Sequence, residues 1–263
     1  MKYVLLTGAA GGMGSAASEI LAHSDVTVFA LDRRRVEEKE GIIPIVADVT
    51  DEESLKNALL EISKITPVLD GIIHFAGIYV LDSLVEMERE KFTRTFNINT
   101  FGPYSINRIF MPLLKRGSRI ITVTSELATL DPLPFTGLYA ITKAALDRYC
   151  YSLKMELQLH GINVSVLRAG AVETDMIGAS TAALDDFCKK TTLYSVNAKR
   201  FRNIVEGVEA RSVSCLKLAR KVKKIFFAKN PRFAYSINRN PLLVLLQILP
   251  PSLRFFIIGK ILK

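Results

Sequence analysis

The sequence predicts an α/β fold in one domain, a doubly wound parallel sheet flanked by helices. Short, β-branched apolar runs alternate along the chain with amphipathic helical patterns, and such alternation is typical of parallel strands joined by right-handed crossovers. Polar or glycine residues follow most of these runs, so we expect them to meet at the carboxyl edge of the sheet, where such folds bind ligands. At 263 residues, 49% of them hydrophobic, the chain can bury a large core.

Six apolar runs are predicted to be strands buried on both faces of the sheet, because each is short and β-branched. They cover residues 3–6, 26–31, 42–46, 71–75, 119–123 and 164–167. Helical patterns lie between them at residues 15–22, 90–115 and 137–160. A further helix is predicted to begin at Thr50, where Glu53 three residues on completes a capping box.

The first strand ends in a glycine-rich turn. Its pattern is Thr-Gly-x-x-x-Gly-x-Gly, formed by Thr7, Gly8, Gly12 and Gly14. Backbone N–H groups in such a turn, at the start of a helix, can surround a pyrophosphate. The second strand ends at Asp32, 18 residues after Gly14, near the roughly 20 expected of an acid that binds the adenosine ribose. The alternative is that Asp32 only caps a turn.

Two residues of the helical segment 137–160 indicate acid–base chemistry. Tyr139 and Lys143 are four residues apart, so their side chains lie on one face of a helix. An ammonium one turn from a tyrosine favours the phenolate, so we expect Lys143 to lower the pKa of Tyr139. That would make Tyr139 a general acid/base. The alternative is a chance pair on a solvated helix.

These features resemble the short-chain dehydrogenase/reductase family, and the resemblance extends over nearly the whole chain. It implies a Rossmann-like fold that binds a nicotinamide cofactor through the first turn and the segments after the following strands. The cofactor-binding positions would be Thr7, Gly8, Gly12, Met13, Gly14, Asp32, Arg33, Asp48, Val49, Ala76, Gly77, Tyr139, Lys143, Gly170, Val172 and Thr174. The catalytic residues would be Asn99, Ser125, Tyr139 and Lys143.

The resemblance also implies a role for each catalytic residue. Tyr139 would exchange a proton with the substrate oxygen, and Ser125 would hydrogen-bond that oxygen. Lys143 would hold the nicotinamide ribose, and Asn99 would hold a water that links Lys143 to solvent. Asn99 could instead be a satisfied core amide.

The chain departs from the family pattern at three places. His74-Phe75-Ala76-Gly77 stands where the family usually has Asn-Asn-Ala-Gly, and we expect His74 to be a buried strand-end residue with a nearby hydrogen bond. The Ser125-to-Tyr139 spacing is one residue longer than usual, which leaves Thr124 as the alternative if the register slips. Ala169 occupies a position that is normally proline.

The amino-acid composition indicates a reducing compartment and argues against a metal centre. Cys150, Cys188 and Cys215 are widely spaced, with no C-x-x-C pair and no metal-ligand spacing around the histidines, so we expect reduced thiols and no metal site. The N-terminus leads directly into the first strand without a secretory-type segment. We expect the protein to be cytoplasmic.

Charge is concentrated in the C-terminal part. Residues 189–263 hold 17 Lys or Arg but only Glu206 and Glu209, whereas residues 1–188 are net acidic. We therefore divide the chain into a cofactor-binding domain over residues 1–240 and a basic, apolar tail over residues 241–263. The tail could lie on an anionic membrane surface or pack over the substrate pocket or a neighbouring subunit. Nucleic acid is the weaker candidate, because no recognition motif accompanies the charge.

Together these observations predict an oxidoreductase that transfers a hydride between a nicotinamide cofactor and a hydrophobic alcohol or ketone. Apolar residues in the segments expected to bind substrate favour a steroid-, retinoid- or fatty-acyl-like molecule, and the tail weakly resembles that of retinol and hydroxysteroid dehydrogenases. NAD(H) is favoured because Asp32 would repel a 2′-phosphate, and NADP(H) is the alternative because Arg33 could bind one. We expect a homodimer or homotetramer. The alternative functions are a non-catalytic dinucleotide sensor or scaffold and an epimerase.

Overall fold

The computed structural model describes residues 1–173, 175–209 and 211–263, and for residues 175–182 and 208–209 it describes the backbone alone. Among these residues seven parallel strands form one sheet, in the order β3-β2-β1-β4-β5-β6-β9. The strands are β1 (Lys2–Thr7), β2 (Val26–Asp32), β3 (Ile42–Val46), β4 (Leu69–His74), β5 (Leu114–Ser125), β6 (Asn163–Ala169) and β9 (Ala234–Ile237). The sequence order reverses between β1 and β4, so the ligand crevice of a doubly wound sheet lies there.

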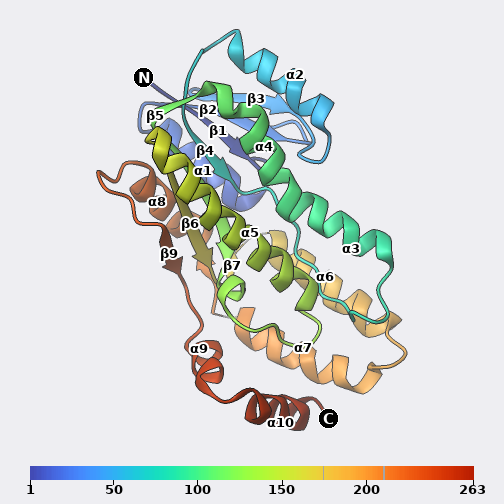
Figure 1. The fold of residues 1–263 in the computed structure, drawn as a ribbon. Coiled ribbons are helices and arrows are strands. Elements are labelled where there is room, and N and C mark those ends of the chain that lie inside the picture. Colours follow the sequence, from blue (N-terminus) through green and yellow to red (C-terminus); the bar gives the residue numbers. More distant parts are fainter. Residues whose placement is uncertain (174, 210) are drawn as a thin grey trace.

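Helices cover both faces of the sheet (Figure 1). One face packs against α1 (Gly12–Ala22) and α8 (Cys215–Phe226), and the other against α2 (Glu52–Ser63), α4 (Gly102–Phe110) and α5 (Gly137–Leu157). The neighbouring residues Leu5 and Leu6 of β1 are both fully buried, one in each of the two resulting cores. Continuous apolar strands are therefore the pattern that this architecture requires.

Beyond the carboxyl ends of the strands lies a smaller helical layer (Figure 1). It contains α6 (Asp175–Lys190), α7 (Ser195–Glu209), α9 (Pro241–Ile248) and α10 (Pro251–Leu262), with the two-residue strands β7 (Val172–Glu173) and β8 (Val213–Ser214) at its base. A third apolar cluster, which includes Leu81, Leu184, Phe201 and Leu262, joins this layer to the rest of the molecule. Part of the tail is thus buried against the protein itself.

The structure corrects three local predictions. Strand β9 was not expected, since its four residues, Ala-Tyr-Ser-Ile, form no continuous apolar run. The helical pattern predicted over 90–115 is divided into α3 (Arg89–Phe96), a π-helical turn (Asn97–Phe101) and α4, and β5 already begins at Leu114. Helix α2 is capped by Asp51, whose carboxylate accepts the backbone N–H of Glu53, and not by Thr50.

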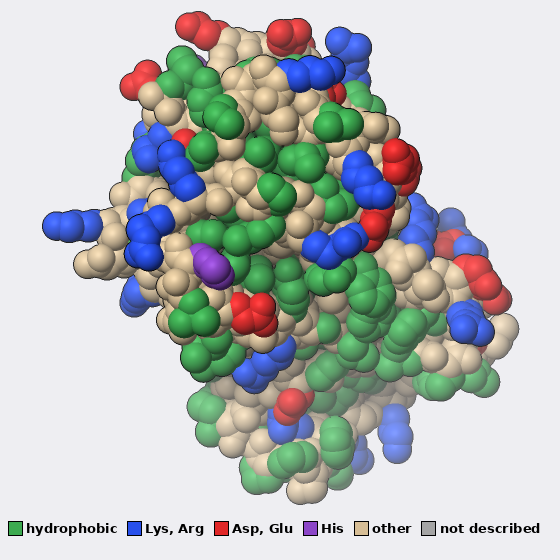
Figure 2. Space-filling model, turned by 45° about the horizontal axis from the view of Figure 1, so that its top comes forward, with side chains coloured by type: hydrophobic (Ala, Val, Ile, Leu, Met, Phe, Trp, Pro, Cys, Tyr) green, Lys and Arg blue, Asp and Glu red, His purple; other side chains and the backbone are tan. Residues whose placement is uncertain are grey.

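The surface carries apolar groups among its charges. Figure 2 shows hydrophobic side chains gathered across the middle of the visible face, with charged groups scattered around them. Along α3, the π-helical turn, α4 and α5, the exposed large hydrophobic residues are Phe92, Phe101, Tyr104, Ile141, Tyr151 and Met155. Within the described residues, no helix is both long and apolar enough to cross a membrane.

Candidate active site

The glycine turn fits a bound dinucleotide. Gly8 has φ 72°, and a Cβ there would lie 2.6 Å from the backbone nitrogen of Ala76, while a Cβ on Gly14 would lie 2.2 Å from the carbonyl oxygen of Gly8. Both positions therefore require glycine. Thr7 links the turn to the loop after β4, because its Oγ1 accepts the N–H of Ala76 at 3.3 Å. The result is a tight backbone cradle at the start of α1, where Gly12 and Met13 lie and where phosphates bind favourably.

The two acids predicted at the adenosine end lie at the ends of neighbouring strands. Asp32 accepts the N–H of Ala10, within the glycine turn, at 3.1 Å and that of Arg34 at 3.0 Å. Asp48 accepts the N–H and the hydroxyl of Thr50 at 2.8 and 2.7 Å. Burial acts to raise the pKa of Asp48, but these hydrogen bonds and the nearby Arg33 and Arg94 outweigh it and lower the pKa.

A surface cavity of about 480 Å³ opens beside these acids. It is lined by Arg33, Asp48, Thr50, Arg89, Glu90, Thr93, Arg94, Asn97 and Ile98. Val49 faces the start of α4, where its side chain lies 3.0 Å from the position a Cβ on Gly102 would take. The structure thus places Arg33 with Asp48, and Asp32 against the glycine turn.

Asn99 lies in the π-helical turn and is fully buried. Its Oδ1 accepts the N–H of Ile78 at 2.8 Å, and its Nδ2 donates to the carbonyl of Ile78 at 2.9 Å and to Oγ1 of Thr142 at 3.2 Å. A Cβ on Gly77 would lie 3.2 Å from both Asn99 Oδ1 and Lys143 Nζ. Asn99 is therefore a satisfied amide that fixes the loop after β4 against α5, next to Lys143.

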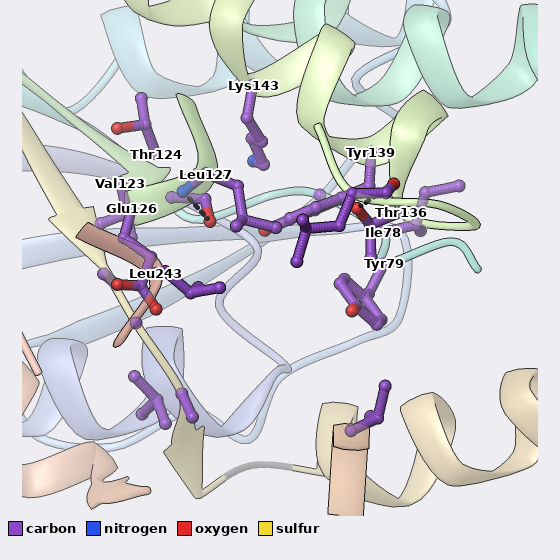
Figure 3. A pocket seen from close by; sticks show the side chains of 18 of the residues that line it. Ile78, Tyr79, Val123, Thr124, Glu126, Leu127, Thr136, Tyr139, Lys143 and Leu243 are labelled. Carbon is purple, nitrogen blue, oxygen red and sulfur yellow. Dashed lines mark hydrogen bonds between the residues drawn. The ribbon is translucent and has the colours of Figure 1, made fainter. Parts of the chain in front are cut away.

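The three remaining catalytic candidates line one cavity, in which Figure 3 labels Tyr139 and Lys143. Ser125 ends β5, and Tyr139 and Lys143 come from consecutive turns of α5. The Ser125 hydroxyl accepts the N–H of Leu127 at 3.2 Å and lines the cavity together with Tyr139. The hydroxyl of Thr124 is instead directed to Asp147, at 3.4 Å. The longer loop between Ser125 and Tyr139 therefore leaves the serine in register.

The pKa of Tyr139 is not lowered as the sequence suggested. Burial raises it to about 12, opposed only by the influence of the nearby Ser125 hydroxyl. Lys143 is itself buried, and this desolvation lowers its pKa to about 8. Its Nζ lies 5.8 Å from the centre of the Tyr139 ring. In the protein alone desolvation is the main influence on both pKa values, so Tyr139 is protonated and Lys143 is mostly charged at neutral pH.

The cavity above these residues has a volume of about 220 Å³ and mostly apolar walls. Its lining includes Met13, Ile78, Tyr79, Leu127, Leu133, Gly170, Val172, Phe201, Ile204 and Leu243. The side chains come from the loops after β4, β5 and β6, from α7 and from α9. The candidate catalytic residues thus line a site suited to an apolar molecule.

The segment after β6 contributes backbone to this cavity. Gly170 and Val172 line it, whereas Thr174 lies outside the described residues. A Cβ on Gly170 would lie 1.9 Å from the carbonyl oxygen of Asn238, so the position requires glycine. Arg168 turns away and binds Asp147 through two hydrogen bonds of 2.9 and 2.8 Å. This pair of a half-buried arginine and a buried aspartate joins β6 to α5.

His74 is a buried structural residue, as predicted. Its Nε2 lies 2.9 Å from Oδ1 of Asn107, whose Nδ2 donates to the hydroxyl of Tyr149 at 3.1 Å. Burial lowers the pKa of His74 to about 4, so the ring is neutral. This series of hydrogen bonds connects β4 with α4 and α5. Among the described residues no cluster of His, Cys, Asp and Glu could hold a metal ion.

Sequence reasoning did not single out several residues of the cavity, among them Tyr79, Glu126 and Leu243. Glu126 directly follows Ser125 and is buried, with only 6% of its surface exposed. Leu243 arrives from the tail, more than a hundred residues further along the chain. A carboxylate within an apolar loop was a signal for Glu126, but nothing in the sequence indicates which face of α9 meets the cavity.

Comparison with known proteins agrees with this geometry. Residues 2–185 match the family model described as short chain dehydrogenase. A probable short-chain type dehydrogenase/reductase of Helicobacter pylori, VdlC, is 26% identical over 256 residues, 94% of this chain and 93% of its own. The 3-ketodihydrosphingosine reductase of Bacteroides thetaiotaomicron is 24% identical over 239 residues, 90% of this chain and 88% of its own.

Solved structures share the fold. A short chain dehydrogenase from Burkholderia cenocepacia in complex with NADP aligns with a TM-score of 0.70 and 22% identity, covering 90% of this chain and 96% of its own. A 3-ketoacyl-(acyl-carrier-protein) reductase from Brucella melitensis complexed with NADH aligns with a TM-score of 0.73 and 19% identity, with the same coverage. The chain belongs to the short-chain dehydrogenase family.

Proposed function

We propose that this protein is an oxidoreductase that transfers a hydride between a nicotinamide cofactor and a hydrophobic alcohol or ketone. The observation that carries the proposal is the convergence of Ser125, Tyr139 and Lys143 on one mostly apolar cavity, with the ammonium of Lys143 5.8 Å from the centre of the Tyr139 ring. A non-catalytic protein with the same fold would have no need to bring these three groups together.

Each side chain has a role in this reaction. In reduction, Tyr139 donates its hydroxyl proton to the carbonyl oxygen, and Ser125 hydrogen-bonds the same oxygen. The positive charge of Lys143 stabilises the phenolate that forms on Tyr139. When bound in the glycine cradle, the nicotinamide cofactor supplies or accepts the hydride. In the oxidation direction, Tyr139 as phenolate takes up the proton of the alcohol.

For the cofactor we favour NAD(H) over NADP(H). Asp32 would repel a 2′-phosphate from its place against the glycine turn. Arg33 favours NADP(H), but it lies near Asp48, which already offsets part of its charge. A solved relative contains NADH and another contains NADP, which supports the class of cofactor and leaves the choice to these two residues.

The substrate is proposed to be steroid-, retinoid- or fatty-acyl-like. Leu127, Leu133 and Phe201 give the cavity apolar walls, which favours a molecule with an extended hydrocarbon part. One relative is named as a reductase of 3-ketodihydrosphingosine, a long-chain ketone. Its name supports an acyl-like ketone most directly.

We also propose partners. The exposed apolar residues along α3, α4 and α5 support a homodimer or homotetramer formed through these helices. The outer face of the tail supports contact between a cytoplasmic protein and an anionic membrane surface. Leu242, Leu245, Ile248, Phe255 and Phe256 are each at least 60% exposed there, and no acidic residue follows Glu209.

The test is the variant Tyr139→Phe. We expect it to fold and to bind cofactor like the native protein, but to lose roughly 100-fold or more in turnover because the general acid is gone. Cofactor absorbance is followed with NADH and NADPH against a panel of steroid, retinoid and 3-ketoacyl carbonyls, and dissociation constants of both cofactors are measured beside it. Native turnover by this variant would refute the assignment, and tighter NADPH than NADH would reverse the cofactor preference.

A further inference from the structure

Glu126 joins the catalytic serine to the tail. It directly follows Ser125 at the start of a 3₁₀ turn and lines the cavity. Its Oε2 accepts the backbone N–H of Asn240 at 2.7 Å. Its Oε1 lies 3.0 Å from the position a Cβ on Gly170 would occupy. A buried carboxylate that accepts a backbone N–H makes a strong, directional contact, so Glu126 fixes Asn240 relative to Ser125.

Asn240 in turn begins the helix that covers the cavity. Its Oδ1 accepts the N–H of Leu242 at 2.9 Å and so caps α9. Leu243, one residue further on, lines the cavity, whereas its neighbour Leu242 is 62% exposed. The position of Asn240 therefore decides whether Leu243 meets the cavity.

The loop after Ser125 holds the tail at a second place. The backbone N–H of Asp131 donates to Oε1 of Gln247 at 3.1 Å, and Nε2 of Gln247 donates to the Asp131 carbonyl at 3.3 Å. Arg254 of α10 forms an ion pair with the Asp131 carboxylate. Both helices of the tail are thus attached to residues of the loop that follows the catalytic serine.

We propose that Glu126 is a positioning residue, whose hydrogen bond to Asn240 holds α9 over the substrate cavity so that Leu243 forms one of its walls. The inference rests on the proposed function, because it concerns the substrate of the same site. Leu243 is then a specificity-determining residue for the apolar part of the substrate. Glu126 acts through α9 and takes no part in proton transfer.

The matched variants are Glu126→Ala and Glu126→Gln. Glutamine keeps an acceptor oxygen for the Asn240 N–H, whereas alanine removes it. We expect Glu126→Ala to raise KM for the best carbonyl of the panel roughly 10-fold, the effect of losing one hydrogen bond to a charged group, with kcat within about 3-fold. Glu126→Gln should restore KM to within about 3-fold of the native value.

Asn240 provides the reciprocal test. Its φ of −78° is compatible with proline. Asn240→Pro removes both the N–H donor and the side-chain cap, whereas Asn240→Ala removes only the cap and is the matched control. We expect Asn240→Pro to raise KM above that of Asn240→Ala by the same factor as Glu126→Ala raises the native KM, and Glu126→Ala to add nothing further in the Asn240→Pro background. Leu243→Ala should change the ranking of large and small substrates, and its neighbour Leu242→Ala should leave it unchanged.

A readout without substrate separates this inference from the proposed function. Hydrogen exchange of the amides of residues 240–248 should be faster in Glu126→Ala than in the native chain and close to native in Glu126→Gln, whatever reaction the enzyme performs. Thermal unfolding and cofactor binding control for the fold. Native exchange in Glu126→Ala, or equal damage in Glu126→Gln and Glu126→Ala, would overturn the positioning role.

Discussion

At the scale of single residues, burial shifts the pKa values of Tyr139 and Lys143 in opposite directions. Burial alone would keep the proton on Tyr139, since it raises the tyrosine pKa to about 12. The same burial lowers the pKa of Lys143 to about 8, close to the pH at which it has to be charged. The lysine therefore limits how alkaline the medium can be before the positive charge beside Tyr139 is lost.

Lys143→Met should make the protein more stable and inactive. The unfolded chain holds the lysine proton up to the ordinary pKa of 10.5, whereas the folded protein releases it near 8. Between these values the unfolded state binds more protons, so the free energy of unfolding of the native protein rises with pH. Removing the buried charge should add on the order of 1–3 kcal/mol at pH 7 and flatten this rise.

Denaturant unfolding of the native chain and of Lys143→Met from pH 7 to 10.5 measures the effect. The matched control is Lys56→Met, an exposed lysine on α2, which should leave both stability and its pH dependence unchanged. In the native enzyme the rate of reduction should fall as pH rises through about 8. If Lys143→Met is less stable than the native protein at pH 7, other groups of the fold stabilise the charge of Lys143 and the predicted gain is wrong.

At the scale of elements, short-range contacts place the boundaries. Asp51 lies at the N-cap of α2 and accepts the N–H of Glu53 at 3.0 Å. Thr50 lies one residue before the cap, where its N–H and hydroxyl both donate to Asp48. The acid predicted to face the adenosine therefore also holds the residue that precedes α2.

Asp51→Ala should lower the free energy of unfolding by about 1 kcal/mol, the typical effect of losing an N-cap. Thr50→Ala should have the smaller effect, because Thr50 loses only a hydrogen bond at an exposed position. Urea unfolding of the two variants distinguishes them. If Thr50→Ala is the more destabilising, the capping box predicted from the sequence would describe the helix better.

At the scale of the whole molecule, the tail has two different faces. Its inner face is part of the protein, since Leu262 is buried with Phe201 and its carbonyl accepts Nδ2 of Asn197 at 2.6 Å. Arg254 is used internally, with Asp131. The outer face carries the exposed apolar residues, and Lys260 lies over the ring of Phe256 at 5.7 Å. The same segment can therefore pack against the protein through its inner face and contact a membrane through its outer face.

The double variant Phe255→Ser/Phe256→Ser should weaken binding to vesicles of phosphatidylglycerol and phosphatidylcholine without disturbing the cavity. These rings are 74% and 61% exposed, and their insertion would add to the attraction between the lysines and anionic lipid. Flotation of the vesicles measures binding, which should also fall with salt and with Lys260→Gln/Lys263→Gln. Leu60→Ser, an equally exposed residue on α2, is the control.

Light scattering separates this outcome from subunit contact. The homo-oligomer should persist in the tail variants, because the surface proposed for it lies on α3, α4 and α5. A change of oligomer size on mutating Phe255 and Phe256, or a native chain that ignores anionic vesicles, would assign the outer face to a second copy of the chain or to no partner.

The sequence by itself determined the sheet, the glycine turn and the identity of the catalytic candidates. These features follow from local rules: buried parallel strands must be apolar, Gly8 and Gly14 must lack a Cβ, and Tyr139 and Lys143 share a helix face whatever surrounds them. The tertiary structure decided what depends on distant neighbours. It set the pKa of Tyr139 through burial, added β9 beside β6, and brought Glu126 to Asn240 across 114 residues of chain. Desolvation and long-range hydrogen bonds have no periodic signature in a sequence, so only the folded chain reveals them.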